Sequence, residues 1–168
     1  VPFGGIYRII DFTLSNCINS GLRRMYVLIQ YKSFSLQKHI LSGWNIFSNQ
    51  LGEFIDVVPA QMRIGADWYR GTADAIYQNL YTIRDQNPNM VLVLAGDHIY
   101  KMDYKKMIEY HIEKDADMTV ACIQMPKETS SQFGVIEVDK ENRVRGFQEK
   151  PGSPKTIPTS PKNIFASM

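Results

Sequence analysis

The chain has 168 residues, of which 44% are hydrophobic and 21% charged, and this composition is typical of one soluble globular domain or part of one. It excludes disordered, collagen-like and coiled-coil proteins. The formal net charge of +2 is too small to indicate a nucleic-acid or membrane-surface partner. Any anionic ligand must therefore be bound by a few specifically positioned groups and not by the overall charge.

The cysteine spacing and the length of the apolar runs indicate the cellular compartment of the protein. Cys17 and Cys122 match no CxxC or zinc-binding spacing, which fits a reducing environment. The longest apolar run, residues 90–95, is far too short to span a membrane, and no leader peptide opens the chain. We therefore expect a cytoplasmic protein. Because the chain begins at Val1 and stops at Met168 within a new apolar segment, we also expect it to be cut at both ends.

Helices and strands are predicted to alternate over the first two thirds of the chain. The strand MVLVLAGD is expected to be the most strongly buried one. In chain order the spacing predicts a helix over 12–20, a strand over 25–30, a helix over 33–43, a strand over 54–58, a helix over 73–83, a strand over 90–97, a helix over 104–112 and a strand over 117–124.

The last third changes its period. FGVIEVD and RVRGFQE alternate around residues 140–142, which predicts an antiparallel hairpin, and residues 151–161 are rich in proline and read as an irregular crossing. Strands that alternate with helices predict an α/β fold with a mixed, mostly parallel sheet and helices on both faces. In such Rossmann-like folds, ligands bind at the carboxyl ends of the strands.

One candidate site residue stands where the strand over 90–97 ends. Gly96 lets a ligand approach, and Asp97 follows it in LAGDHIY. Mg²⁺ is usually held by one or two carboxylates together with substrate phosphates, so this aspartate suits magnesium. A cap of the following turn is the structural alternative, and the local pattern leaves both readings open.

Two further motifs indicate anion binding. RGTAD, residues 70–74, lies where a helix is predicted to begin, and unpaired amides there favour an anion or a base edge; a simple N-cap at Thr72 is the alternative. In QEKP, Lys150 follows a strand and is suited to a phosphate, and Glu149 could accept sugar hydroxyls. A solvated surface pair is the alternative for these two residues.

The chain as a whole resembles bacterial ADP-glucose pyrophosphorylases, also called glucose-1-phosphate adenylyltransferases. The segments that carry the resemblance are VPFGGIYRIIDFTLSNCINSGLRRMYVLIQYKS, WYRGTADAIYQNL, VLAGDHIYKMDY, FGVIEVD, FQEKP and ASM. The resemblance covers essentially all of the chain and implies a partial catalytic nucleotidyltransferase domain, of the GT-A-like kind, over residues 1–168. It favours the functional reading of each motif.

The family's reaction, which the resemblance implies, converts ATP and α-D-glucose 1-phosphate into ADP-glucose and pyrophosphate, the committed step of glycogen or starch synthesis. By the same resemblance, Asp97 and Lys150 are the catalytic residues: Asp97 holds Mg²⁺, and Lys150 binds the phosphate of glucose 1-phosphate. The residues implied around the sugar are Tyr69, Gly134, Glu149 and Ser167, and those implied on the nucleotide side are Gln61, Gly71, Thr72 and Asp74.

The resemblance also implies allosteric regulation and additional segments in the full-length protein. Gln30 and Trp68 stand in loops that transmit an effector signal in relatives activated by sugar phosphates, and Arg8 and Ser35 resemble contacts of an allosteric anion site. Pro2 replaces a histidine of many enteric relatives. The family's glycine-rich loop, a second metal carboxylate and the C-terminal β-helix domain are not in the sequence, so we expect no turnover by the isolated 168 residues and a homotetramer for the full-length protein.

Three alternatives differ in class. A non-catalytic regulatory subunit of the same enzyme is disfavoured by the intact Asp97 and Lys150. A uridylyl- or thymidylyltransferase of the same fold is disfavoured by WYRGTADA. A Rossmann-like domain that binds a mononucleotide without chemistry would not need Lys150 for glucose 1-phosphate.

Overall fold

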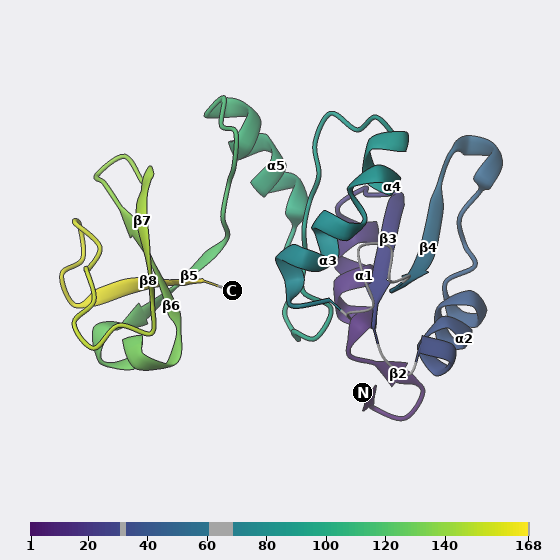
Figure 1. Ribbon diagram of the computed structural model, residues 1–168, viewed down its shortest axis with the longest axis horizontal. Helices are drawn as coiled ribbons and strands as arrows, with labels where there is room; N and C mark the ends of the chain where they lie inside the picture. Colours follow the sequence, from purple (N-terminus) through teal and green to yellow (C-terminus); the bar gives the residue numbers. More distant parts are fainter. Residues whose placement is uncertain (31–32, 61–68, 168) are drawn as a thin grey trace. The chain divides into compact units, whose positions relative to one another are not determined.

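The computed structural model describes residues 1–30, 33–60 and 69–167 and divides the chain into two compact units, Val1–Lys105 and Lys106–Met168 (Figure 1). In the described part of the chain, no helix combines the length and the apolar character that a membrane span requires. The elements up to the end of the first unit are β1 (Pro2–Phe3), β2 (Tyr7–Arg8), α1 (Ile10–Asn19), β3 (Arg24–Ile29), α2 (Ser33–Gly43), η1 (Asn49–Leu51), β4 (Phe54–Pro59), α3 (Thr72–Gln78), α4 (Leu80–Asp85) and the start of α5 (Tyr104–Glu113).

The core of the first unit lies against a parallel strand pair, β3 and β4. One face of the pair, which includes Ile55 and Val57, packs on a buried cluster from α1, β3, α2 and the start of α5: Leu14, Cys17, Met25, Ile40 and Tyr104. Because side chains alternate along a strand, Tyr26 faces the other way, where it lines a pocket together with Tyr81 of α4. The predicted α/β class, with parallel neighbours and helices on both faces, is confirmed here.

The second unit is built on an antiparallel sheet with the strand order β5-β8-β6-β7. Its strands are β5 (Cys122–Pro126), β6 (Gly134–Val138), β7 (Val144–Glu149) and β8 (Asn163–Ser167), and η2 (Lys127–Gln132) connects the first two. The predicted hairpin is confirmed as β6 and β7. Asp139 closes its turn by accepting hydrogen bonds from the amides of Glu141 and Arg143. As predicted, residues 151–161 are irregular apart from a bridge between Ile157 and Ser160.

The prediction of a deeply buried strand over residues 90–97 is wrong. No strand pairs with this segment in the described part of the chain, and Val91 and Val93 are 53% and 59% exposed. Leu92 and Leu94 alternate with them and pack on the core of the first unit. An apolar run is buried on both faces only where neighbouring strands bring layers to both faces, and this segment packs on one face only.

Two other boundaries differ from the prediction. The helix over 73–83 is two helices, α3 and α4, which meet at Asn79, because the Asn79 backbone leaves the helical region at φ −110° and ψ 11°. The strand predicted over 117–124 begins only at Cys122, where pairing with β8 begins. The ends predicted at residues 20 and 43 for the first two helices are confirmed to within one residue, since α1 ends at Asn19 and α2 at Gly43.

Side chains of α1 hold the segment that carries Asp97. The Thr13 hydroxyl donates to the carbonyl of Ala95 at 3.1 Å, and the Asn16 amide donates to the carbonyl of Tyr100 at 2.9 Å. Thr13 and Asn16 are both buried. These bonds satisfy carbonyl groups that no strand partner satisfies in the described part of the chain.

We predict that Asn16→Ala lowers the free energy of unfolding of the first unit by about 1–3 kcal/mol, because the Tyr100 carbonyl loses its donor. Urea denaturation followed by tryptophan fluorescence measures this. The exposed Asn19 on the same helix provides the matched control, and Asn19→Ala should change stability by no more than about 0.5 kcal/mol. Equal losses for the two variants would contradict the proposed role of Asn16.

Candidate functional site

Asp97 lies in a bend directly after Gly96, with its carboxylate 85% exposed. The imidazole of His98 lies beside it, with Nε2 3.8 Å from Asp97 Oδ1. In the described ranges no backbone amide donates to this carboxylate, so the capping alternative gains no support. An exposed carboxylate with its oxygens available is the ligand type that Mg²⁺ takes together with substrate phosphates.

The described residues contain no cluster of three or more His, Cys, Asp or Glu side chains that could enclose a metal ion. A closed structural metal site needs several protein ligands, whereas a magnesium ion bound together with substrate phosphates needs only one or two carboxylates.

The motif RGTAD forms the start of α3. Gly71, with φ 148°, occupies the N-cap position, and Thr72 is already the first helical residue, so the alternative of a Thr72 N-cap is wrong. Asp74 Oδ2 accepts hydrogen bonds from the Arg70 amide and from Gln78 Nε2, both at 2.9 Å. The carboxylate thereby fixes the first turn, and Gly71 and Thr72 remain exposed.

Tyr69 directly precedes this motif and is half-buried. Its hydroxyl oxygen accepts a hydrogen bond of 2.9 Å from Asn79 Nδ2. Asn79 is only 4% exposed, and sequence reasoning missed it. The only signal that could have found it is a polar residue among the apolar positions of the helix predicted over 73–83.

Four of the residues predicted around the sugar phosphate come together in the second unit. Gly134 lies opposite Glu149 in the β6–β7 register, and a Cβ built on Gly134 would lie 2.8 Å from Ser167 Oγ. Lys150 follows Glu149, and its amide donates to the Phe133 carbonyl at 3.2 Å. The strand ends therefore gather a carboxylate, a hydroxyl and an ammonium group at one end of the hairpin.

The Lys150 backbone has a φ of 43°, in the left-handed region that side chains other than glycine rarely adopt. Its Nζ lies 3.7 Å from Glu149 Oε1, and the two side chains are 60% and 65% exposed. Such strain costs on the order of 1–3 kcal/mol and persists only where surrounding contacts impose it. Here the next residue is also held, because the Ser130 hydroxyl donates to the Pro151 carbonyl at 2.8 Å.

The predicted anion contacts Arg8 and Ser35 also meet. Arg8 Nη2 donates to Ser35 Oγ at 2.8 Å beside an open pocket of about 500 Å³. Lys38 and His39 line the same pocket, and sequence reasoning missed both, although Lys38 follows Ser35 at the helical spacing of three residues. The pocket is therefore rich in basic and hydroxyl groups.

Asp11 is hydrogen-bonded to two of the residues that line this pocket, Arg8 and His39. Its carboxylate accepts hydrogen bonds from the Arg8 amide, His39 Nε2 and Trp44 Nε1, each at 2.8 Å. Burial raises the pKa of Asp11, but these hydrogen bonds together outweigh burial and hold the pKa below its ordinary value. The carboxylate thus stays charged and ties α1 to α2.

The roles predicted for Gln61, Trp68 and Gln30 stay predictions. Gln61 and Trp68 lie outside the described residues. Gln30 follows β3 and is half-buried.

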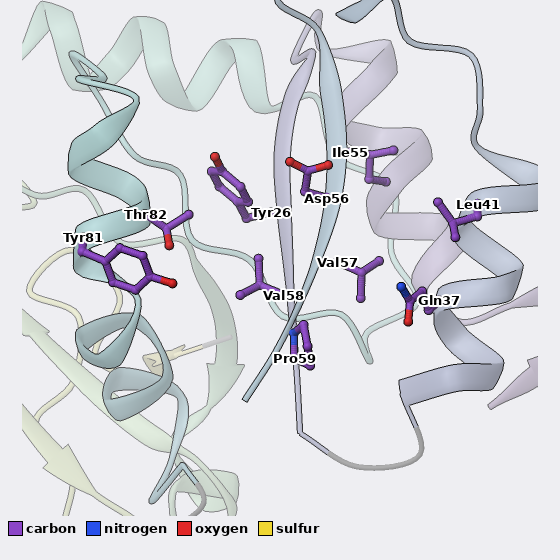
Figure 2. A pocket seen from close by; sticks show the side chains of 10 residues that line it. All are labelled: Tyr26, Gln37, Leu41, Ile55, Asp56, Val57, Val58, Pro59, Tyr81 and Thr82. Atoms are coloured by element: carbon purple, nitrogen blue, oxygen red, sulfur yellow. The ribbon is translucent and has the colours of Figure 1, made fainter. Parts of the chain in front are cut away.

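A second open pocket, of about 390 Å³, lies along β4, and Figure 2 shows side chains on both sides of that strand. It contains none of the residues singled out in the sequence, so it adds nothing to the candidate site.

The chain has close relatives along its whole length. The family model described as Nucleotidyl transferase matches residues 1–167. Glucose-1-phosphate adenylyltransferase 2 of Vibrio cholerae is 55% identical over 168 residues, which are 100% of this chain and 41% of that protein. Proteins named glucose-1-phosphate adenylyltransferase from Methylococcus capsulatus and Paraburkholderia phymatum are 53% and 56% identical, again over 100% of this chain and 40% of their own length. The chain thus spans well under half the length of these curated relatives.

We predict that Gly134→Ala destabilises the second unit by about 1–3 kcal/mol, because the added Cβ would lie 2.6 Å from the Phe147 ring and 2.8 Å from Ser167 Oγ. Chemical denaturation measures the loss. Phe147→Leu in the same chain should recover part of it. Gly152→Ala is the matched control, since a Cβ there meets nothing within 4 Å. If Gly134→Ala were as stable as Gly152→Ala, the close packing would be refuted.

Proposed function

Because the chain belongs to the nucleotidyl transferase family, we propose that it forms part of a glucose-1-phosphate adenylyltransferase. The reaction transfers the adenylyl group of ATP to α-D-glucose 1-phosphate and releases pyrophosphate. The observation that carries the proposal is the identity of 53–56%, over the whole of this chain, to relatives of that name. We further propose that the full-length enzyme is a cytoplasmic homotetramer.

The chemistry requires no nucleophile from the protein. A phosphate oxygen of glucose 1-phosphate attacks the α-phosphorus of ATP in line, a new P–O bond forms, and the bond to pyrophosphate breaks. The protein contributes by positioning the two substrates and by stabilising the negative charge. Exposed charged groups such as Asp97 and Lys150 suit both tasks.

Asp97 is the proposed catalytic carboxylate and magnesium ligand. When bound, Mg²⁺ neutralises charge on the phosphates of ATP and helps to orient them. The exposed Asp97 carboxylate, held in place through Thr13 and Asn16, is suited to hold the ion from the protein side. Gly71, Thr72 and Asp74, together with Gln61, are the proposed nucleotide contacts.

Lys150 is the proposed ligand of the glucose 1-phosphate phosphate group. An ammonium is a compact positive charge with three donors, which suits a phosphate dianion. The Glu149 carboxylate and the Ser167 hydroxyl, which lie at the same end of the hairpin, can bind sugar hydroxyls. Tyr69 is a further proposed substrate contact.

Regulation by an anion is proposed for the pocket at Arg8 and Ser35. The guanidinium and hydroxyl are already hydrogen-bonded to each other, so an anion there would meet a preorganised donor pair. Gln30 and Trp68 are the proposed transmitting residues.

The catalytic proposal is tested by pyrophosphate release from the full-length gene product with Mg²⁺. We expect ATP to be used in preference to UTP and dTTP. Lys150→Ala should raise the KM for glucose 1-phosphate on the order of 10²-fold, because a bound phosphate would lose its cation. Asp97→Asn should lower kcat on the order of 10²-fold with a smaller change in that KM.

Either of two results would refute this assignment. One is a Lys150→Ala enzyme with an unchanged KM for glucose 1-phosphate. The other is equal turnover with UTP and ATP, which would favour a different nucleotidyl donor. Lys140→Ala, which removes an exposed lysine from the β6–β7 turn, is the matched control for loss of one positive charge.

The regulatory proposal is tested with inorganic phosphate as the probe. We expect phosphate to change the KM for ATP of the full-length enzyme, and Arg8→Ala to abolish this response, since one charged donor of the pocket is removed. Arg145→Ala, which removes an exposed arginine paired with Asp139, should keep the response. An Arg8→Ala enzyme that responds like the parent would place the effector elsewhere.

A further inference from the structure

Asn79 is the one buried amide side chain that contacts a proposed substrate residue in the described part of the chain. The residue is 4% exposed, and it lies at the junction of two helices, as the C-cap of α3 and the N-cap of α4. A buried amide is stable only when its polar atoms are hydrogen-bonded. Its partners therefore decide how it is oriented.

The orientation of this amide follows from one partner. The Asn79 side chain lies 2.7 Å from the carbonyl oxygen of Ala75, and a backbone carbonyl can only accept. The atom that faces Ala75 must therefore be Nδ2. The same Nδ2 lies 2.9 Å from the Tyr69 hydroxyl. Both hydrogens of the Asn79 amide group are thus committed, one to Ala75 and one to Tyr69.

This arrangement sets the direction of the Tyr69 hydroxyl. A phenol oxygen that accepts from Asn79 keeps its own hydrogen for another acceptor. We infer that Asn79 is a positioning residue which makes Tyr69 a hydrogen-bond donor to a substrate oxygen. The acceptor is a sugar hydroxyl or phosphate oxygen of glucose 1-phosphate, or a phosphate oxygen of ATP. The inference rests on the proposed function, because it takes Tyr69 as a substrate contact.

The geometry also predicts what Asn79 does not do. With both amide hydrogens used inside the protein, Asn79 does not donate to the substrate. Its effect on binding should therefore pass through Tyr69 alone, and the two residues should be energetically coupled. A purely structural role for Asn79 would act on stability without depending on the Tyr69 hydroxyl.

The test is a double-mutant cycle on the full-length gene product with Asn79→Asp and Tyr69→Phe. Dissociation constants are measured by calorimetry, separately for glucose 1-phosphate and for Mg²⁺-ATP. A carboxylate at position 79 accepts the Tyr69 hydrogen, so Asn79→Asp should weaken the ligand that contacts Tyr69 by about tenfold. In the Tyr69→Phe background the same change should have little further effect.

A second measurement covers the case in which Asn79→Asp does not fold. Tyr69 is replaced by p-methoxyphenylalanine, which keeps the oxygen that accepts from Asn79 but has no hydrogen to donate, and by p-aminophenylalanine, which keeps a donor. We expect the methoxy variant to lose affinity as Tyr69→Phe does, and the amino variant to retain more of it. Asn163→Asp, at an amide that donates to Ser160 in the second unit, is the matched control.

The outcomes separate the inference from the proposed function. Equal losses on Asn79→Asp with and without the Tyr69 hydroxyl would overturn the inference, and so would full affinity in the methoxy variant. Lys150→Ala is measured in parallel. If it weakens glucose 1-phosphate while the cycle shows no coupling, only the inference fails; if it leaves glucose 1-phosphate unaffected, the proposed function fails.

Discussion

Buried side-chain donors hold the segments that carry the candidate site residues of the first unit, and this constraint shapes the rest of that unit. Asp97 and Tyr69 both lie outside strand ladders. Carbonyl groups near Asp97 are satisfied by Thr13 and Asn16 of α1, and Tyr69 is held by Asn79. Because an unsatisfied buried polar group is costly, the bonds from Thr13 and Asn16 hold backbone carbonyls near Asp97, and the bond from Asn79 holds the Tyr69 side chain. Exposed reactive groups can therefore be placed on segments that are otherwise irregular.

The second unit solves the same problem with strand register. Pairing of Gly134 with Glu149 places the hairpin end, and the following turn then forces Lys150 into the left-handed region. The backbone conformation of Lys150 sets where its ammonium group can lie, since the side chain itself is largely exposed. Close packing at Gly134 links this end to Ser167 of β8. The unit thus presents an ammonium group, a carboxylate and a hydroxyl from the ends of paired strands, and sites on strands position ligands more precisely than sites on loops.

Much of the fold could be predicted from the sequence where local pattern decides the structure. The strand at β3, the helix α2 and the β6–β7 hairpin follow from hydrophobic period and turn residues. The segment over 90–97 could not be predicted, because burial of both its faces depends on neighbouring strands and not on its own residues. The break at Asn79 also escaped prediction, since the apolar spacing continues across it while the Asn79 backbone leaves the helical region. Pattern alone left Asp97 and Lys150 undecided, and the family resemblance supplied their roles.

The central claim is that Asp97 and Lys150 act on the two substrates of one reaction. Asp97 would act on ATP through a magnesium ion, and Lys150 would bind the phosphate of glucose 1-phosphate. A crystal structure of the full-length gene product with ADP-glucose and Mg²⁺ tests this most directly. The account predicts an Asp97 oxygen about 2.0–2.1 Å from the ion and Lys150 Nζ within about 2.7–2.9 Å of an oxygen on the phosphate attached to glucose. Product bound with the Asp97 carboxylate in solvent, or with another residue of the protein as the phosphate's cation, would contradict it.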